Sequence, residues 1–160
     1  MSESSSEAGA TPGRSAPGRL RHLSTVLLGL LVVESVLGVA IAMYVSLPSS
    51  PTFLSVFTSI PLLTAHIVLA FLLVVVAVYA TVLAWRLRVS GTTGLEVLTL
   101  LFLLFAIQEG FAYTFDQNNM YALGMVVGFL GALVVQVVVV YRLSRTVRMT
   151  MPAPPSSPPA

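Results

Sequence analysis

The sequence predicts an all-α integral membrane protein: a bundle of four helices with both termini in the cytoplasm. Of its 160 residues, 56% are hydrophobic and only 9% are charged, whereas soluble domains carry about 25% charged residues. Four apolar segments each reach the roughly 20 residues that a helix needs to cross a bilayer. All eight basic residues lie before the first apolar segment, between the second and third, or at and beyond the end of the fourth, so that one side of the membrane holds every positive charge.

The element boundaries follow from where the apolar segments begin and stop. Residues 1–18 are rich in Ser, Gly, Pro and Ala and are expected to be disordered, and the Pro-rich residues 149–160 are expected to form a flexible tail. The membrane domain spans residues 20–148, with helices predicted at the following ranges: 24–47, 61–86, 94–115 and 120–143. Valine-rich stretches are assigned to helix because a lone strand in lipid leaves its backbone unpaired.

The arginines predict the orientation. They are Arg14, Arg19, Arg21, Arg86, Arg88, Arg142, Arg145 and Arg148. The positive-inside rule then makes this a multi-pass protein of the cell membrane with both termini and the middle loop inside. The lipid bilayer is the expected partner and nucleic acid is not, because orientation accounts for the basic residues. The chain lacks cysteine, which excludes thiolate metal sites and covalent haem attachment through cysteines.

A weak internal similarity joins the first helix to the third and the second to the fourth. The segment LGVAIAMY at 37–44 resembles EGFAYTF at 109–115, and HIVLAFL at 66–72 resembles GMVVGFL at 124–130. The bundle is therefore interpreted as two helical hairpins of similar design.

Polar residues inside the apolar segments need a reason, because a charged side chain at the bilayer centre costs about 2.5–3.5 kcal/mol. Counting about 1.5 Å per residue places Glu34 near the middle of the first helix. Five residues fall in the outer half, where we expect them to share one layer: His66, Gln108, Glu109, Tyr121 and Met125. Gln136 and Glu96 fall toward the inner side.

Small residues mark helix faces that pack closely in membranes. Alanines recur every seven residues from Ala70, which predicts that His66, one turn earlier, points into the bundle. Glu34 shares a stripe with Gly38. On the last helix, packing is predicted for Gly124, Gly128 and Gly131, either within the bundle or in a dimer.

His66 is the first candidate for a functional residue. One interpretation is an axial ligand of a haem iron, with glycines making room for the macrocycle and Met125 as a second ligand at the same depth. The other is a histidine hydrogen-bonded to Glu109 or Gln108 for packing. Glu34 and Glu109 are candidates either for proton transfer or for interhelical hydrogen bonds.

The layout resembles one four-helix half of the haem A synthase family. The resemblance rests on Glu34-Ser-Val-Leu-Gly38, on His66 early in the second helix, and on Gln108-Glu109-Gly110 late in the third. It implies that haem b is ligated through His66. The second histidine of that family is missing from the fourth helix, as is its acidic and histidine motif in the first outer loop. The resemblance therefore implies a single-bundle relative, which is either a haem-binding accessory protein or needs a partner half, rather than an active synthase.

Three functions follow as hypotheses. The first is a haem-binding membrane protein. The second is a non-catalytic subunit or assembly factor of a larger respiratory complex, or a homo-oligomer, assembled through the glycine and alanine faces. The third is an oligomeric proton-coupled transporter that uses Glu34 and Glu109. The sequence contains no recognisable catalytic triad or phosphate-binding loop.

Overall fold

Four long helices make up the described part of the chain. The computed structural model describes residues 16–45, 60–89 and 91–149, and these contain no strand. The helices are α1 (Ala16–Tyr44), α3 (Pro61–Leu87), α4 (Thr92–Asp116) and α5 (Asn119–Met149). Each is long and apolar enough to cross a membrane. The predicted all-α bundle of four spans is confirmed, and the protein is a multi-pass membrane protein surrounded by lipid.

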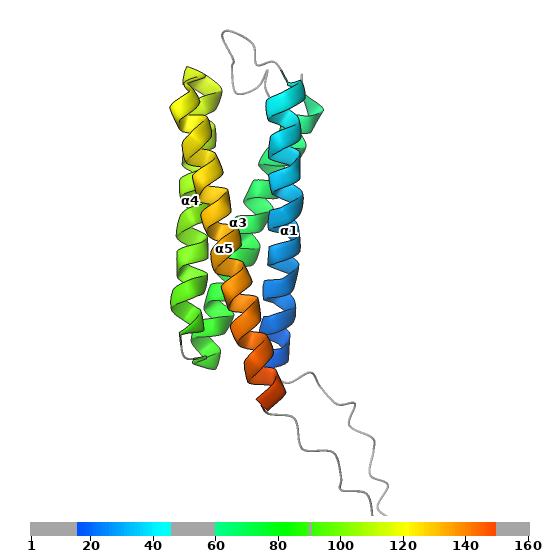
Figure 1. Ribbon diagram of the computed structural model, residues 1–160, viewed down its shortest axis with the longest axis vertical. Coiled ribbons are helices and arrows are strands. Elements are labelled where there is room, and N and C mark those ends of the chain that lie inside the picture. Colours follow the sequence, from blue (N-terminus) through cyan, green and yellow to red (C-terminus); the bar gives the residue numbers. More distant parts are fainter. Residues whose placement is uncertain (1–15, 46–59, 90, 150–160) are drawn as a thin grey trace, which may run out of the picture.

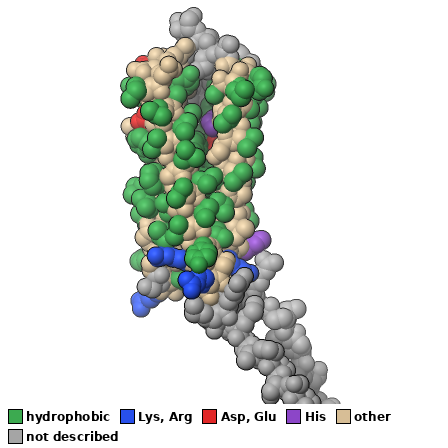
Figure 2. Space-filling view, in the orientation of Figure 1, with side chains coloured by type: hydrophobic (Ala, Val, Ile, Leu, Met, Phe, Trp, Pro, Cys, Tyr) green, Lys and Arg blue, Asp and Glu red, His purple; other side chains and the backbone are tan. Residues whose placement is uncertain are grey.

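The helices run up and down in succession and form a four-cornered bundle (Figure 1). α1 packs against α3 and α5, and α4 packs against the same two helices. The first residues of α1 and the last residues of α5 therefore lie at the same end of the bundle (Figure 1). Arginine side chains gather at this end (Figure 2), which we call the arginine end; the opposite end is the distal end.

Two helices extend further than the sequence predicted. α1 begins at Ala16, inside the segment assigned to a tail, because Pro17 occupies a first-turn position where no backbone N–H is needed. α5 continues to Met149 because no helix-breaking residue interrupts the arginine-containing segment before Pro152. α1 ends at Tyr44, three residues earlier than predicted, and the rest of that connection lies outside the described residues.

Local backbone chemistry sets the two turns next to α4. Gly91 has φ 73°, a left-handed conformation that favours glycine, just before α4 begins. At the other end Gln117 also adopts a left-handed conformation and caps α4. The side chain of Asn118 then accepts a hydrogen bond of 3.0 Å from the backbone N–H of Met120, which satisfies one of the free donors at the start of α5.

The buried face of each helix follows a seven-residue repeat. On α3 the buried positions alternate in steps of three and four; they are Leu63, His66, Ala70, Leu73, Ala77, Ala80 and Ala84. On α4 the steps are the same; the positions are Thr92, Glu96, Thr99, Leu103 and Ala106. This spacing is that of left-handed helix packing, in which the side chains of one helix fit between those of its neighbours.

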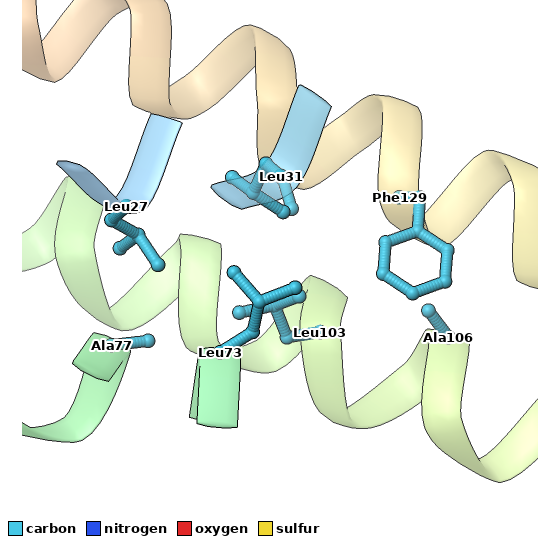
Figure 3. Packing of buried hydrophobic residues seen from close by; sticks show 8 residues of the cluster. Leu27, Leu31, Leu73, Ala77, Leu103, Ala106 and Phe129 are labelled. Atoms are coloured by element: carbon cyan, nitrogen blue, oxygen red, sulfur yellow. The ribbon is translucent and has the colours of Figure 1, made fainter. Parts of the chain in front are cut away.

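Apolar side chains from all four helices fill the middle of the bundle (Figure 3). We call this cluster the leucine layer; its buried members are Leu27, Leu31, Leu73, Ala77, Leu103, Ala106, Phe129 and Ala132. A smaller cluster lies toward the arginine end and consists of Leu20, Ala84, Val139 and Leu143. Between and beyond these apolar layers the repeat places polar side chains, so the fold itself brings them into the interior.

Candidate functional site

His66 and Glu34 face each other inside the distal half of the bundle. Nδ1 of His66 on α3 lies 2.9 Å from Oε1 of Glu34 on α1, without the alignment of a regular hydrogen bond. Glu34 is fully buried, and the side chain of His66 is 11% exposed. The prediction that His66 points into the bundle is therefore confirmed, but its partner is Glu34.

The short contact requires a proton between the two groups, since two lone pairs at this distance would repel each other. If this proton is carried by Nδ1 of a neutral ring, Nε2 keeps its lone pair. In metal sites a histidine ligand is commonly held in this way, by a carboxylate on the nitrogen that does not bind the metal. Among the described residues Nε2 has no hydrogen-bond partner, so it is the nitrogen available to a ligand.

A cavity adjoins the His66 ring. It encloses about 130 Å³, and about 1,020 Å³ is free of protein atoms when its open mouth is counted. All four helices line it, and Figure 2 shows the hollow in the distal half with a histidine inside it. The lining is almost wholly apolar; small residues contribute Gly38, Ala42, Ala70, Ala106, Gly110 and Ala122, and aromatic residues contribute Phe71, Phe111, Tyr113, Phe115 and Phe129.

Small residues keep this space open and aromatic residues wall it. A Cβ added to Gly38 would lie 3.5 Å from Cε1 of His66, and one added to Gly110 would lie 3.3 Å from Sδ of Met125. The ring of Phe129 lies 6.2 Å from that of His66, centroid to centroid, in a tilted arrangement. Met125 lines the same cavity as His66, so the prediction that these two residues share a layer is confirmed.

Gln108 and Glu109 do not join this layer, and the prediction that one of them pairs with His66 is wrong. Gln108 is exposed at the bundle surface. Glu109 lies against Gly124 in a shallow groove between α4 and α5, which Tyr121 also lines. The reason is helical phase: the buried face of α4 continues from Ala106 to Gly110, and residues two or three positions after Ala106 lie to the side of that face.

A second set of buried polar side chains lies toward the arginine end. We call it the inner polar layer, and it consists of Ser24, Glu96, Thr99 and Gln136 from α1, α4 and α5. Ser24 Oγ donates to Glu96 Oε1 at 2.8 Å, Thr99 Oγ1 donates to Gln136 Oε1 at 3.1 Å, and Gln136 Nε2 donates to the backbone carbonyl of Ser24 at 3.3 Å. All four side chains are fully buried. The sequence placed Glu96 and Gln136 on the inner side but did not predict that they meet.

The glycines of α5 pack against α4 of the same chain. A Cβ on Gly128 would lie 2.8 Å from Cβ of Ala106, and one on Gly131 would lie 2.7 Å from the ring of Phe102. Both contacts are with α4, so these two glycines allow α4 and α5 to approach each other closely within the bundle. α4 and α5 contact each other more extensively than α1 and α3 do, so the two hairpins are not packed alike.

The fold and its interior define a helical membrane protein with a buried histidine–carboxylate pair beside an apolar cavity. Comparison with protein-family models, with curated protein sequences and with solved structures finds no match. The basis for a functional proposal is therefore the His66–Glu34 pair and the cavity beside it.

Proposed function

We propose that the protein binds a haem in the distal cavity, with Nε2 of His66 as the axial ligand of the iron. The observation that carries this proposal is the contact of Nδ1 with Glu34. A buried carboxylate would fix the ring orientation and the tautomer that leaves Nε2 free, and it would raise the basicity of the ligand. A haem bound here would supply one-electron redox chemistry; the residues of the chain would hold and orient it.

The residues around His66 fit such a group in chemistry and in shape. Aromatic and small apolar side chains give the flat, apolar walls that a macrocycle requires. The enclosed volume of about 130 Å³ is below the roughly 300–1,000 Å³ of pockets that bury small organic ligands, so a ligand of that size would also extend into the open mouth of the cavity.

Met125 is the proposed second axial ligand. It lines the cavity from α5, whereas His66 comes from α3, the helix diagonally opposite in the bundle. Thioether sulfur serves as the second ligand opposite histidine in c-type cytochromes. α5 contains no histidine, and Met125 is the methionine of this helix that lines the cavity.

The proposal includes the orientation of the protein. The arginine end would face the cytoplasm of a cell membrane and the His66 cavity would lie toward the outside, as the positive-inside rule favours. This orientation can be tested independently, because the chain has no cysteine. A cysteine introduced at an exposed position of each end would be labelled in intact cells only at the outer end.

The absorption spectrum of protein purified from haem-replete cells tests the proposal directly. We expect a Soret band that His66→Ala abolishes and that His22→Ala preserves, because His22 is exposed near the arginine end. Glu34→Gln should retain the band but weaken haem affinity by about 10–100-fold, the usual effect of losing a carboxylate partner of a ligand histidine. A colourless wild-type protein, or a band that survives His66→Ala, would rule the proposal out.

The alternatives gain less support from the structure. Assembly with other subunits or copies was predicted to use the glycines of α5. These glycines already contact α4, so they do not support such an assembly. A transporter using both Glu34 and Glu109 would need them on one path. The first lies inside the bundle, and the second lies in a surface groove between α4 and α5.

A further inference from the structure

Glu96 has one carboxylate oxygen that nothing in the described structure satisfies. Its Oε1 accepts the hydrogen bond from Ser24, but Oε2 is buried and has no hydrogen-bond partner. Glu96 is fully buried within an apolar span. Among the described residues no basic side chain lies within ion-pair distance of it. A lone ionised carboxylate in this setting is costly, and no described side chain supplies the positive charge that would balance it.

The oxygens around Glu96 can supply a small cation site. After the three hydrogen bonds of the inner polar layer are made, Ser24 Oγ, Thr99 Oγ1 and Gln136 Oε1 each keep a lone pair. Carboxylate, hydroxyl and amide oxygens are the ligands that hard cations prefer. Glu96 balances one positive charge only, and the described residues contain no cluster of three His, Cys, Asp or Glu side chains that a transition metal would favour.

We propose that the inner polar layer takes up and releases one monovalent cation on Glu96, either a proton or a sodium ion. This proposal does not depend on the haem proposal. Ser24 and Glu34 are ten residues apart on α1, about 15 Å along the helix, and Leu27 and Leu31 of the leucine layer lie between them on that helix.

No second titrating group of the interior faces Glu96 among the described residues. At its level α1 contributes Ser24 and α5 contributes Gln136, and α3 contributes apolar side chains. The charged groups on the neighbouring helices belong to the arginine end, and the described ones are Arg19, Arg21, Arg86, Arg88, Arg142 and Arg145. These arginines form no ion pair with Glu96, so a pH-dependent difference between wild type and a Glu96 variant would come from Glu96.

Infrared spectroscopy of the protein in lipid tests the exchange. The difference between wild type and Glu96→Gln isolates the signal of this carboxyl group. We expect an acid band that gives way to a carboxylate band, either as the pH is raised in the absence of sodium or when sodium replaces choline at constant pH. The first result identifies a proton site and the second a sodium site. A Glu96 signal that is the same in every buffer, whether acid or carboxylate, would overturn the proposal.

Labelling with a hydrophobic carbodiimide gives a second measurement that needs no variant. The reagent reacts with protonated carboxyl groups in lipid, and mass spectrometry locates the product. We expect Glu96 to be labelled, with labelling suppressed at alkaline pH or by sodium. Glu109, which is partly exposed in the groove between α4 and α5, is the internal control for the reagent. Labelling of Glu109 without labelling of Glu96 in any buffer would overturn the proposal even if Glu96→Gln does not fold.

Discussion

Gly128 sets the distance between α4 and α5, and replacing it tests the packing of the bundle. A Cβ at this position would lie 2.8 Å from Cβ of Ala106 and 3.0 Å from its Cα and backbone N. Ordinary contacts between carbon atoms are about 3.5–4.0 Å. Gly128→Ala therefore requires the two helices to separate locally by about 1 Å. Neither the backbone of Ala106 nor a Cβ can rotate away, so the helix itself has to move.

The cost can be estimated from this displacement. Overpacking of this kind costs about 1–3 kcal/mol when the backbone has to shift, and a gap of up to about 1 Å forfeits a quarter to a half of each neighbouring contact. The higher helix propensity of alanine adds little compensation, because the separated helices remain helical in lipid. We expect Gly128→Ala to lower the free energy of unfolding by about 1–3 kcal/mol.

Gly29→Ala is the matched control. No heavy atom of a neighbouring residue lies within 4 Å of a Cβ at Gly29, and this glycine is exposed on α1. The same substitution there should leave the free energy of unfolding nearly unchanged. The chain has no cysteine, so donor and acceptor dyes can be placed on cysteines at the lipid-facing positions Val36 and Val134. Their energy transfer is then followed through an SDS titration. Equal stability of the two alanine variants would refute the packing argument.

Three further substitutions can be measured in the same titration. Glu34→Met alone should destabilise the bundle by about 3 kcal/mol, because it leaves His66 buried without its partner; adding His66→Leu should recover most of this loss, since replacing both members of a buried pair is often close to neutral. Failure of the double variant to recover stability would refute a simple pair. Gln136→Leu should cost about 1–3 kcal/mol through the unpaired donor it leaves on Thr99, and a neutral result would mean that the inner polar layer does not hold the helices together. Leu73→Ala should lower the free energy of unfolding by about 2 kcal/mol, the low end for soluble cores, because lipid solvates the leucine of separated helices and only the cost of the cavity remains. Val75→Ala at a lipid-facing position is the control, and an equally large loss there would contradict this reasoning.

The fold was predictable because its strongest determinants are local in the sequence. Length and hydrophobicity identify four spans, and prolines mark the start of α3 and the end of the segment that forms α1. The alanine repeat on α3 also fixed the direction of His66. In that helix the small residues at every seventh position distinguish the packed face from the lipid-facing one.

Gln108 and Glu109 were wrongly expected to face His66 because α4 carries no repeat of small residues near them, comparable to the alanine repeat of α3, that would identify its buried face. In lipid the buried and the exposed faces of a helix are both apolar, so hydrophobicity alone does not fix the rotation of α4. The useful signal was Thr92, Glu96 and Thr99, three polar residues in steps of four and three. Extending that repeat leads to Ala106 and Gly110 and leaves Gln108 and Glu109 off the buried face.

The His66–Glu34 pair and the inner polar layer together join all four helices, and α1 contributes a side chain to each. Glu34 contacts α3 through His66, and Ser24 contacts α4 and α5 through Glu96 and Gln136. Apolar packing in lipid allows neighbouring registers of similar energy, whereas a slip of one helix would separate these polar partners within hydrocarbon. A few buried polar residues can fix the register of packed helices in this way. In this bundle the side chains proposed to bind a haem and a cation are therefore also the ones that determine how α1 aligns with the other three helices.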